Sequence, residues 1–417
     1  MNSAQPPAAA PHVLIANIFF APYTYGGATI VAEEVAQHLR QTHGWQVSVV
    51  SAMSRSDLVP YAIQKVEKDG IANYLINLPH GRSYAEMYNN SNVTEAVARL
   101  IGAIGPDLLH LHCIQEIGAG IVSAARQRDV PVILSTHDFW WICERQFMIR
   151  MDDVYCGQDP VDIEQCRGCV GNMAQARTRF HYLRGEAAQA DLITFPSHFA
   201  MDLSQRSGLT AQDAAVWPNG VNQPGQAFFD SQARRRARDP QLRFGYVGGP
   251  SHIKGWPIIR RAFSQLERDD FSGLLVDGGM ADPWWKGIDL STMRGDWKVV
   301  PRFSQKTMDD FYAEIDVLLF LSQWKETFGL TIREAIARGI RVIQTDSGGT
   351  VEHVMADPAH MLQIGDGAQA LRREIEHVLD APEAHPAPTP VDSFADQARH
   401  FTELAAPLLS ARTRVSG

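Results

Sequence analysis

Short strand-like runs alternate with amphipathic, helix-like segments along this chain, and the alternation occurs in two series. In the first series the strand-like runs lie at 12–20, 45–52, 107–112 and 131–138. In the second series they lie at 242–249, 272–279, 297–303, 317–322 and 341–349. Strands that are apolar on both faces are typical of parallel sheets covered by helices on both sides. The pattern therefore predicts an α/β protein with two such sheets.

The break between the two series is predicted near VWPNGVNQPG at 216–225, and the polar, basic segment 231–241 is predicted to be part of the linker. The N-terminal domain is predicted to comprise 1–222 together with 392–417, and the C-terminal domain 223–391. Ligands of such sheets bind beyond the carboxyl ends of the strands. We therefore expect a ligand-binding cleft between the two domains.

Composition excludes several classes of protein. The 417 residues include 47 acidic and 38 basic side chains, for a net charge of −9, which argues against a protein that wraps nucleic acid. The N-terminus lacks a secretory signal, and no apolar run reaches the ~18 residues of a membrane span. We expect a cytoplasmic protein without a membrane span, and peripheral association with the inner face of the membrane stays open.

Two glutamates in SQWKETFGLTIREAIARG, at 322–339, indicate an elongated ligand. Glu326 and Glu334 lie eight positions apart, which on one helix corresponds to about 12 Å. The paired carboxylates of glycosidases lie only about 5–9.5 Å apart. The two side chains are therefore predicted to contact different parts of one ligand; the alternative is a pair of solvated charges at a helix end.

Two glycine-rich turns follow predicted strands and suit an anionic ligand. In FGYVGGPSHIKGW, Gly248 lies in the turn and Lys254 is placed to offset charge on a phosphate. In APYTYGGAT, Gly26 and Gly27 allow the backbone to approach a ligand closely. The alternatives are a solvated lysine after a tight turn and, for the glycine pair, a turn without a ligand.

Polar and aromatic side chains also follow the strand that ends near residue 135. The candidates there are His137, Asp138, Trp140 and Trp141. A histidine at a strand's carboxyl end is either an active-site residue or, more often, a hydrogen-bonded structural residue. His110 and His112, in LLHLHC, are predicted to be core histidines or histidines that support the site.

A cysteine-bearing segment comes next in the chain. It contains Cys143, Cys156, Cys166 and Cys169, the last two as a C-x2-C pair. Four thiolates can bind a structural zinc ion, although the other spacings are irregular. Cysteines without a metal in an inserted segment are the equal alternative.

The segment ETFGLTIREAIARGIRVIQTDSGGTVEHV resembles the C-terminal signature of family 4 of the retaining nucleotide-sugar glycosyltransferases, which have the GT-B fold. The resemblance implies that Glu326 contacts the transferred sugar and that Glu334 contacts the ribose of the nucleotide. It places the backbone of Phe328, Gly329 and Leu330 near the phosphates. It also implies two Rossmann-like domains with parallel sheets facing across a cleft, and a C-terminal helix that returns to the N-terminal domain.

Other parts of the family's pattern fall on residues already singled out. Lys254 and the following glycine match a phosphate-binding element, although Gly249 stands where the family has arginine. The resemblance implies that the Gly26–Gly27 loop closes on the diphosphate and that His137, with Asp138 beside it, lies near the reacting sugar. Asp138 and the two adjacent tryptophans are then predicted to form aromatic, polar surface on the acceptor side.

By this resemblance the chain is a retaining hexosyltransferase in polysaccharide or glycoconjugate biosynthesis. The sequence contains no Asp-x-Asp, so we expect catalysis without a metal ion or other cofactor, the leaving phosphate being stabilised by Lys254 and backbone N–H groups. The expected acceptor is a saccharide, a lipid-linked saccharide or a small molecule. The alternatives are a sugar-nucleotide-binding partner subunit without activity, and an epimerase, hydrolase or phosphorylase on the same scaffold.

Overall fold

The computed structural model describes residues 10–279, 282–353, 361–381 and 385–415. The chain forms two compact units. Unit 1 comprises Met1–Phe147, Gln158–Gly220 and Phe394–Gly417, and unit 2 comprises Met148–Gly157 and Val221–Ser393. The chain changes unit after Gly220 and after Ser393, close to the predicted boundaries, and the short segment 148–157 of unit 2 had no counterpart in the sequence analysis.

Unit 1 is built on one large sheet. Its strands are β1 (His12–Ala16), β2 (Gln46–Met53), β3 (Ile63–Lys68), β4 (Ile71–Asn77), β5 (Leu108–Leu111), β6 (Val132–Ser135), β7 (Leu192–Phe195) and β8 (Asp213–Val216). In the described chain they pair in the order β3-β4-β2-β1-β5-β6-β7-β8. All of these pairs are parallel except β3 with β4, which form an antiparallel hairpin at one edge.

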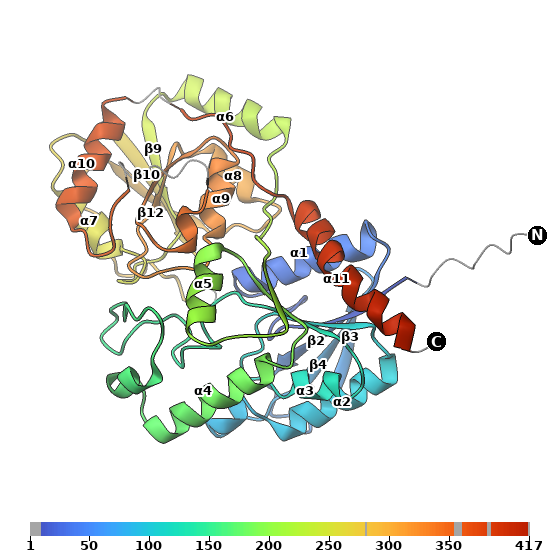
Figure 1. Ribbon diagram of the computed structural model, residues 1–417. Helices are drawn as coiled ribbons and strands as arrows, with labels where there is room; N and C mark the ends of the chain where they lie inside the picture. Colours follow the sequence, from blue (N-terminus) through green and yellow to red (C-terminus); the bar gives the residue numbers. More distant parts are fainter. Residues whose placement is uncertain (1–9, 280–281, 354–360, 382–384, 416–417) are drawn as a thin grey trace, which may run out of the picture. The chain divides into compact units, whose positions relative to one another are not determined.

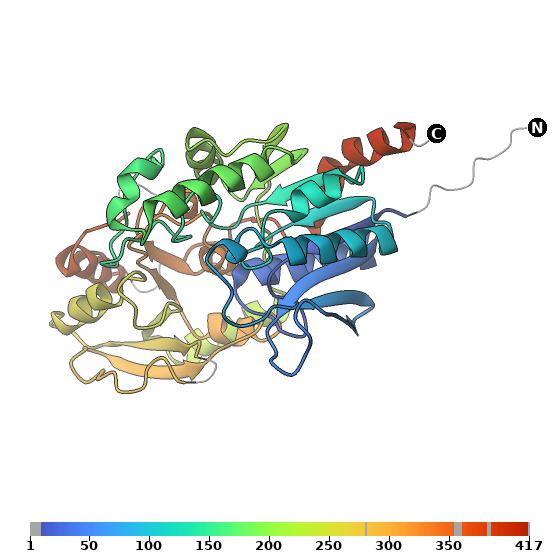
Figure 2. The same ribbon diagram turned by 90° about the horizontal axis from the view of Figure 1, so that it is seen from below.

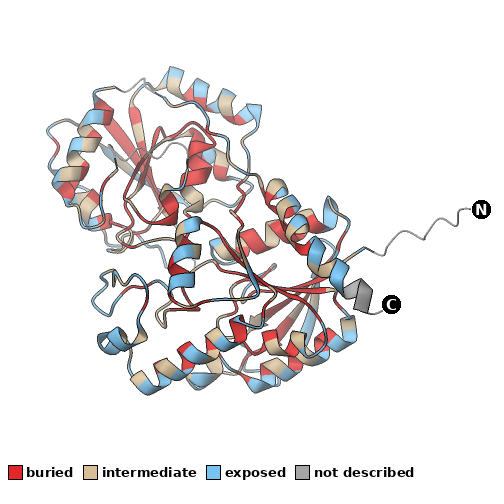
Figure 3. Cartoon of the chain, viewed as in Figure 1, coloured by how far each residue is buried: buried red, intermediate tan, exposed pale blue. Residues whose placement is uncertain are grey.

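Helices cover both faces of this sheet (Figures 1 and 2). They are α1 (Gly27–Gln41), α2 (Ser91–Ile104), α3 (Ile121–Arg126), α4 (Met173–Ala187), α5 (His198–Arg206) and α11 (Phe394–Val415), with short 3₁₀ turns at Ala85–Met87 and Ile163–Gly168. The central strands β1, β5 and β6 are buried along their whole length, as expected for strands covered on both faces. Figure 3 shows these buried strands under helices whose outer faces are exposed.

Unit 2 contains a smaller, all-parallel sheet. Its strands are β9 (Leu242–Tyr246), β10 (Phe271–Asp277), β11 (Asp296–Pro301), β12 (Val317–Phe320) and β13 (Arg341–Gln344), in the order β11-β10-β9-β12-β13. Its helices are α6 (Gln226–Arg238), α7 (Trp256–Ser264), α8 (Met308–Ala313), α9 (Leu330–Ile336) and α10 (Ala368–Leu379), with a 3₁₀ turn at Gly349–Val351. The predicted α/β class with two parallel, Rossmann-like sheets is confirmed.

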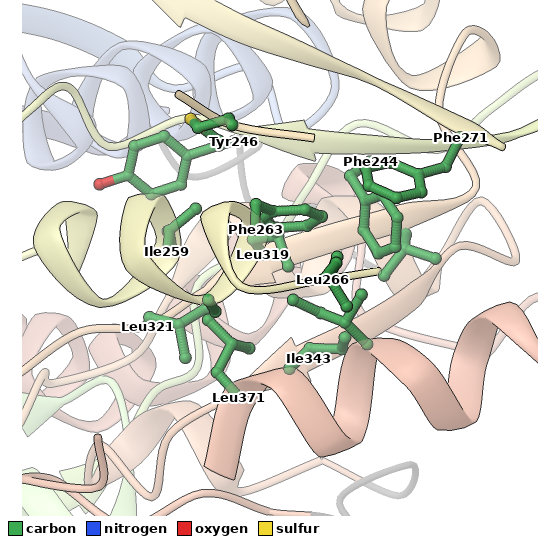
Figure 4. Close-up of a cluster of buried hydrophobic side chains, with 14 of the residues drawn as sticks. Phe244, Tyr246, Ile259, Phe263, Leu266, Phe271, Leu319, Leu321, Ile343 and Leu371 are labelled. Atoms are coloured by element: carbon green, nitrogen blue, oxygen red, sulfur yellow. The ribbon is translucent and has the colours of Figure 1, made fainter. Parts of the chain in front are cut away.

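The core of unit 2 has one layer on each face of the sheet. On one face, α7 and α10 lie side by side and pack Phe263 and Leu371 against the strand residues Phe244, Leu319 and Ile343 (Figure 4). On the other face, α6, α8 and α9 pack against the alternate residues of β10 and β12. Because successive side chains of a strand point to opposite faces, both layers bury apolar residues of the same strands.

The basic segment 231–241 is not a linker, because most of it lies in α6. Arg235, only 3% exposed, donates to both carboxylate oxygens of Asp316 at 2.9 and 2.6 Å, and Arg236 donates to the same carboxylate at 2.9 Å. A buried carboxylate needs such paired partners, and these two arginines supply them. The polar composition that suggested a linker thus belongs to a helix whose arginines bind Asp316, the residue before β12.

The C-terminal helix α11 belongs to unit 1, as predicted for a helix that returns to the N-terminal domain. It packs beside α1, and Phe401 stacks on His110 of β5 with ring centroids 4.3 Å apart. Gln397, which is fully buried, accepts a hydrogen bond from the Gly220 N–H at 2.8 Å. None of the helices in the described ranges combines the length and apolar composition that crossing a membrane requires.

Candidate functional site

The loop between β12 and α9 places Glu326 beside Lys254. The Lys254 Nζ lies 2.7 Å from Oε1 of Glu326, and the Ser322 hydroxyl donates to the same oxygen. The loop is fixed by its backbone: the Glu326 N–H donates to the Ser347 carbonyl at 2.8 Å, and its carbonyl accepts from the Gly349 N–H at 2.9 Å. Two residues predicted from separate motifs therefore form one ion pair.

Lys254 is held on its own loop by aromatic rings and by a glycine. Its Nζ lies 5.8 Å from the ring centroid of Phe320 and 5.4 Å from that of Trp324, within range of cation–π attraction. Gly255 has φ +81°, and a Cβ there would clash with the backbone of Leu321. Glycine at 255 thus lets the lysine loop pass close to the end of β12.

Glu334 is a buried carboxylate on α9, 6% exposed. The Tyr312 hydroxyl donates to its Oε2 at 2.8 Å, and the Gln305 side-chain amide donates to Oε1 at 3.5 Å. Gln305 also accepts from the Asn222 amide at 2.9 Å. Burial raises the pKa of Glu334, and the Tyr312 hydrogen bond acts in the opposite direction. Oε1, whose contact is at the limit of hydrogen-bond length, is the better placed oxygen for a ligand hydroxyl.

Arg333 organises the loops after β12 and β13, a role that sequence reasoning missed. Its guanidinium, 4% exposed, donates to the carbonyls of Phe328, Gly349, Thr350 and Glu352, the last three at 2.9–3.0 Å. It also lies 4.1 Å from the Phe328 ring centroid. Burial lowers its pKa to about 10. The available signal in the sequence was an arginine between the apolar residues of a short helix-like segment, where a solvated charge is not expected.

The predicted phosphate-binding stretch offers backbone rather than side chains. Phe328 is 7% exposed and lies under Arg333, so its ring is part of the packing. Gly329 has φ +84°, where other residues are strained, and a Cβ there would lie 2.9 Å from Thr350. Leu330 is the first residue of α9. The structure thus brings all three residues to the start of this helix.

The glycine turn after β9 explains the departure from the family's arginine. Gly249 has φ +64°, and a Cβ there would lie 2.6 Å from the Trp284 ring. A Cβ at Gly248 would clash with the Tyr246 side chain, whose hydroxyl donates to the Gly249 carbonyl at 2.9 Å. An arginine at 249 is therefore excluded unless Trp284 moves.

In unit 1, the predicted Gly26–Gly27 loop lies at the start of α1. Gly26 has φ +82° and precedes the helix, and Gly27 is its first residue. Thr24 donates to the Glu33 carboxylate at 2.7 Å and so ties the loop to α1. The left-handed backbone of Gly26 accounts for glycine at this position.

Three histidines lie at the ends of β5 and β6. His112 Nδ1 and His137 Nε2 are 2.8 Å apart, and His110 Nε2 lies 2.8 Å from the Ser135 hydroxyl. Burial lowers the pKa of His137 to about 4 and lowers the pKa values of His110 and His112 well below 6.5. The cluster is therefore neutral at neutral pH. His110 and His112 are buried, as predicted for core or supporting histidines.

The prediction that Asp138, Trp140 and Trp141 form an aromatic surface is wrong, because the two tryptophans are buried. The two tryptophans are 7% and 3% exposed, and the Arg179 guanidinium covers the Trp140 ring at 5.0 Å. Asp138 accepts from the Trp140 N–H at 2.8 Å and from the Gln146 amide at 2.6 Å. These side chains hold the loop after β6 together and present no aromatic surface.

The predicted four-cysteine zinc group does not form. Cys143, Cys166 and Cys169 belong to unit 1, whereas Cys156 belongs to unit 2. Cys156 is held in a small hairpin, where its N–H donates to the Met148 carbonyl at 2.8 Å. Within the described ranges, no three His, Cys, Asp or Glu side chains are grouped in a way that could hold a metal ion.

Comparison with known families gives one match for each half of the chain. Residues 25–223 match the family described as Glycosyltransferase Family 4, and residues 229–389 match the family described as Glycosyl transferases group 1. A Klebsiella pneumoniae protein described as an uncharacterized 42.6 kDa protein in cps region is 20% identical over 364 residues. That similarity covers 82% of this chain and 87% of the Klebsiella protein.

Solved structures share the fold over nearly the whole chain. Sucrose-phosphate synthase from Thermosynechococcus elongatus superposes with a TM-score of 0.63 at 16% identity, covering 97% of this chain and 98% of that one. HepE from Anabaena, in complex with UDP and glucose, gives 0.60 at 16% identity, with 98% and 100% covered. The Burkholderia xenovorans trehalose-phosphate synthase in complex with glucose-6-phosphate gives 0.62 at 13% identity, with 97% and 99% covered.

Proposed function

Because the chain belongs to the family 4 glycosyltransferases, we propose that it transfers a hexosyl group from a nucleotide diphosphate to an acceptor hydroxyl, with retention at the anomeric carbon and without a metal ion. The observation that carries this proposal is the contact between Lys254 and Glu326 at 2.7 Å. It places a cation suited to the leaving phosphate beside a carboxylate suited to sugar hydroxyls.

Each part of the donor has a proposed partner. In unit 2, Lys254 and the backbone at Phe328–Leu330 bind the diphosphate. In unit 1, we assign the backbone at Gly26 and Gly27 to an anionic group of the substrate. Glu334 accepts hydrogen bonds from ribose hydroxyls, and its two contacts of 2.8 and 3.5 Å support this, because only one oxygen is firmly held. Glu326 binds the transferred sugar. In unit 1, His137 donates to a sugar hydroxyl of the substrate.

The proposed chemical step balances without any further reactant. The bond between the anomeric carbon and the phosphate oxygen breaks, and a bond from the same carbon to the acceptor oxygen forms on the same face. The acceptor's proton passes to the leaving phosphate, whose developing charge Lys254 stabilises. The side chains of Lys254 and Glu326 are only partly exposed, at 32% and 13%, and charges in such surroundings interact more strongly than they do in bulk solvent.

We propose a role in polysaccharide or glycoconjugate synthesis, with a saccharide or lipid-linked saccharide as acceptor. The similarity to a protein of the Klebsiella pneumoniae cps region supports this role. UDP and glucose in the complex of the structurally similar Anabaena protein make UDP-glucose a sensible first donor to test.

A panel of nucleotide sugars tests the proposal. Thermal unfolding with each compound identifies the donor, because a ligand that binds only the folded state raises the midpoint. The donor is then incubated with candidate acceptors, with and without EDTA, and the anomeric configuration of the product is determined by NMR. We expect EDTA-resistant transfer with retention. Inversion, or a loss of activity on chelation that manganese or magnesium restores, contradicts the proposal.

A binding subunit without activity is the second candidate, and Gly249 favours it. Trp284 occupies the space that an arginine at this position would need, so one cationic phosphate contact of the family is missing. Tight binding of a nucleotide sugar with neither transfer nor hydrolysis would support this candidate. Hydrolysis or epimerisation of the donor without acceptor would instead indicate the remaining alternative.

A further inference from the structure

His112 and His137 form a hydrogen-bonded pair across two neighbouring strands of unit 1. The strands β5 and β6 are parallel, with Leu111 opposite Leu134, so the residues after them emerge at the same edge of the sheet. The two imidazole rings are nearly parallel, at 13°, and His112 Nδ1 lies 2.8 Å from His137 Nε2. This distance requires a proton on one of these two nitrogens.

Only two arrangements of protons satisfy the pair. Burial lowers the pKa values of both histidines, so each ring is neutral at neutral pH and carries one proton. Either His112 Nδ1–H donates to His137 Nε2, or His137 Nε2–H donates to His112 Nδ1. The choice determines which nitrogen of His137 carries its proton.

The far nitrogen of His112 distinguishes the two arrangements. His112 Nε2 is buried and has no hydrogen-bond partner within the described part of the chain. A proton on this nitrogen would create a buried, unpaired N–H, and orphaned donors are rarer in folded proteins than unsatisfied acceptors. The proton of His112 therefore belongs on Nδ1, where it has an acceptor.

From this geometry we propose that His112 is a positioning residue that holds His137 in the Nδ1–H tautomer. Because His137 Nε2 accepts the hydrogen bond from His112, the single proton of neutral His137 must lie on Nδ1. His137 then carries its only hydrogen-bond donor on Nδ1 and does not act as a general base through Nε2. The inference deepens the proposed function and rests on it for the identity of the substrate group, a sugar hydroxyl.

The surrounding side chains hold the His112 ring in place. Its centroid lies 4.1 Å from that of His110, which in turn stacks on Phe401 at 4.3 Å. His110 Nε2 lies 2.8 Å from the Ser135 hydroxyl, and this hydroxyl lies 2.6 Å from that of Thr194. Rotation of the His112 ring would disturb this packed row, so the tautomer of His137 is set by a rigid neighbour.

Nitrogen NMR of the full chain measures the tautomers directly. Protein labelled with ¹⁵N-histidine is recorded in long-range ¹H–¹⁵N correlation spectra, which distinguish Nδ1–H from Nε2–H rings. The signals are assigned from those lost in His137→Gln and in His112→Phe. We expect both rings as Nδ1–H at neutral pH. An Nε2–H signal for His137 in the unsubstituted protein overturns the proposal.

Substitutions at 112 separate the hydrogen bond from the packing. His112→Phe keeps a ring but removes the donor, so His137 should lose its single tautomer and kcat should fall about 10-fold, the cost of a hydrogen bond of ~1.4 kcal/mol. His112→Asn can donate from nearly the same place and should restore the Nδ1–H signal and most of the activity. His112→Asp only accepts and should switch His137 to Nε2–H.

His110→Phe is the packing control, because it changes the ring beside His112 and leaves the His112–His137 bond intact. Its His137 signal should match that of the unsubstituted protein, and a change as large as that in His112→Phe would overturn the proposal. The spectra need no substrate. A protein that shows the expected tautomers but no transfer therefore contradicts the proposed function alone, whereas an active protein with Nε2–H His137 contradicts only this inference.

Discussion

The two units carry their candidate residues in opposite electrostatic states. In unit 1, His110, His112 and His137 are neutral rings whose pKa values burial lowers. In unit 2, Lys254 and Glu326 form an ion pair 2.7 Å apart. A neutral cluster recognises a ligand through the direction of its donors and acceptors. A charged cluster already satisfied by its own pairs must exchange those pairs for ligand contacts.

Because of this difference, ligand binding by the two units should respond to different changes. Within the proposed function, a donor phosphate replaces Glu326 as the partner of Lys254. The Glu326 carboxylate is then free to accept hydrogen bonds from the hydroxyls of the sugar. Binding at unit 2 should therefore depend on charge, whereas the contribution of unit 1 should depend on protonation and tautomer. The following predictions are arranged by the size of the effect expected.

Removing the Glu326 carboxylate should have the largest effect. Glu326→Ala loses a contact to the sugar, whose charge and shape change at the transition state, so kcat should fall about 10²–10³-fold. Steady-state kinetics with saturating donor measure this. Glu352→Ala, another glutamate of the same motif, is the control, and an equal loss there would show that the effect is not specific to Glu326.

Removing Arg333 should be the most damaging change to stability. Arg333→Met leaves the buried carbonyls of Phe328, Gly349 and Thr350 without their donor, which should cost about 3 kcal/mol of unfolding free energy. Urea denaturation measures the loss. The exposed Arg373→Met should stay within about 0.5 kcal/mol of the unsubstituted protein. Similar losses in both variants would contradict the role given to Arg333.

Acid should destabilise unit 1 through its neutral histidines. The folded-state pKa of His137 is about 4, below the unfolded value of 6.5, so between these pH values the unfolded chain binds more protons. Stability is therefore present above pH 6.5 and falls as pH decreases, by about 1–2 kcal/mol for this residue between pH 7 and 5. Urea titrations of His137→Gln should show a shallower decline. An unchanged pH dependence would contradict a neutral His137.

Removing the Tyr312 hydroxyl should have a small, localised effect. Tyr312→Phe keeps the buried ring and loses one hydrogen bond to Glu334, so the Kd of a nucleoside diphosphate should rise about 3–10-fold. Calorimetric titration measures this. With a 2′,3′-dideoxy nucleotide the substitution should have little effect, because the ribose hydroxyls that Glu334 binds are absent. An equal effect on both nucleotides would contradict the proposed contact.

Much of the fold could be predicted from the sequence because buried parallel strands and amphipathic helices have distinct periodicities. The predictions that failed concern segments whose structure depends on contacts with residues distant in the sequence. The basic segment within α6 resembled a linker, since its composition does not reveal that Arg235 pairs with the buried Asp316. The β3–β4 hairpin was missed because β3 is mostly exposed and carries no buried-strand pattern.

The candidate site shows the same limit. Motif resemblance selected Lys254, Glu326 and Glu334, and the roles proposed for them stay predictions. It did not identify Arg333, because the partners of that guanidinium are backbone carbonyls distant in sequence. Trp140 and Trp141 looked suited to an acceptor, since the composition of a loop does not show which of its aromatic residues are buried.

Nucleoside diphosphate binding to two matched variants tests the central claim, that Glu334 and Glu326 bind different ends of the donor. Glu334→Gln and Glu326→Gln both remove one negative charge, and calorimetry gives the Kd for each. The ligand has the ribose but lacks the sugar, so affinity should fall about 10-fold or more in the Glu334 variant. In the Glu326 variant it should hold or rise, because Lys254 no longer has to leave a charged partner. Equal weakening in both variants, or unchanged affinity in the Glu334 variant, would contradict the account.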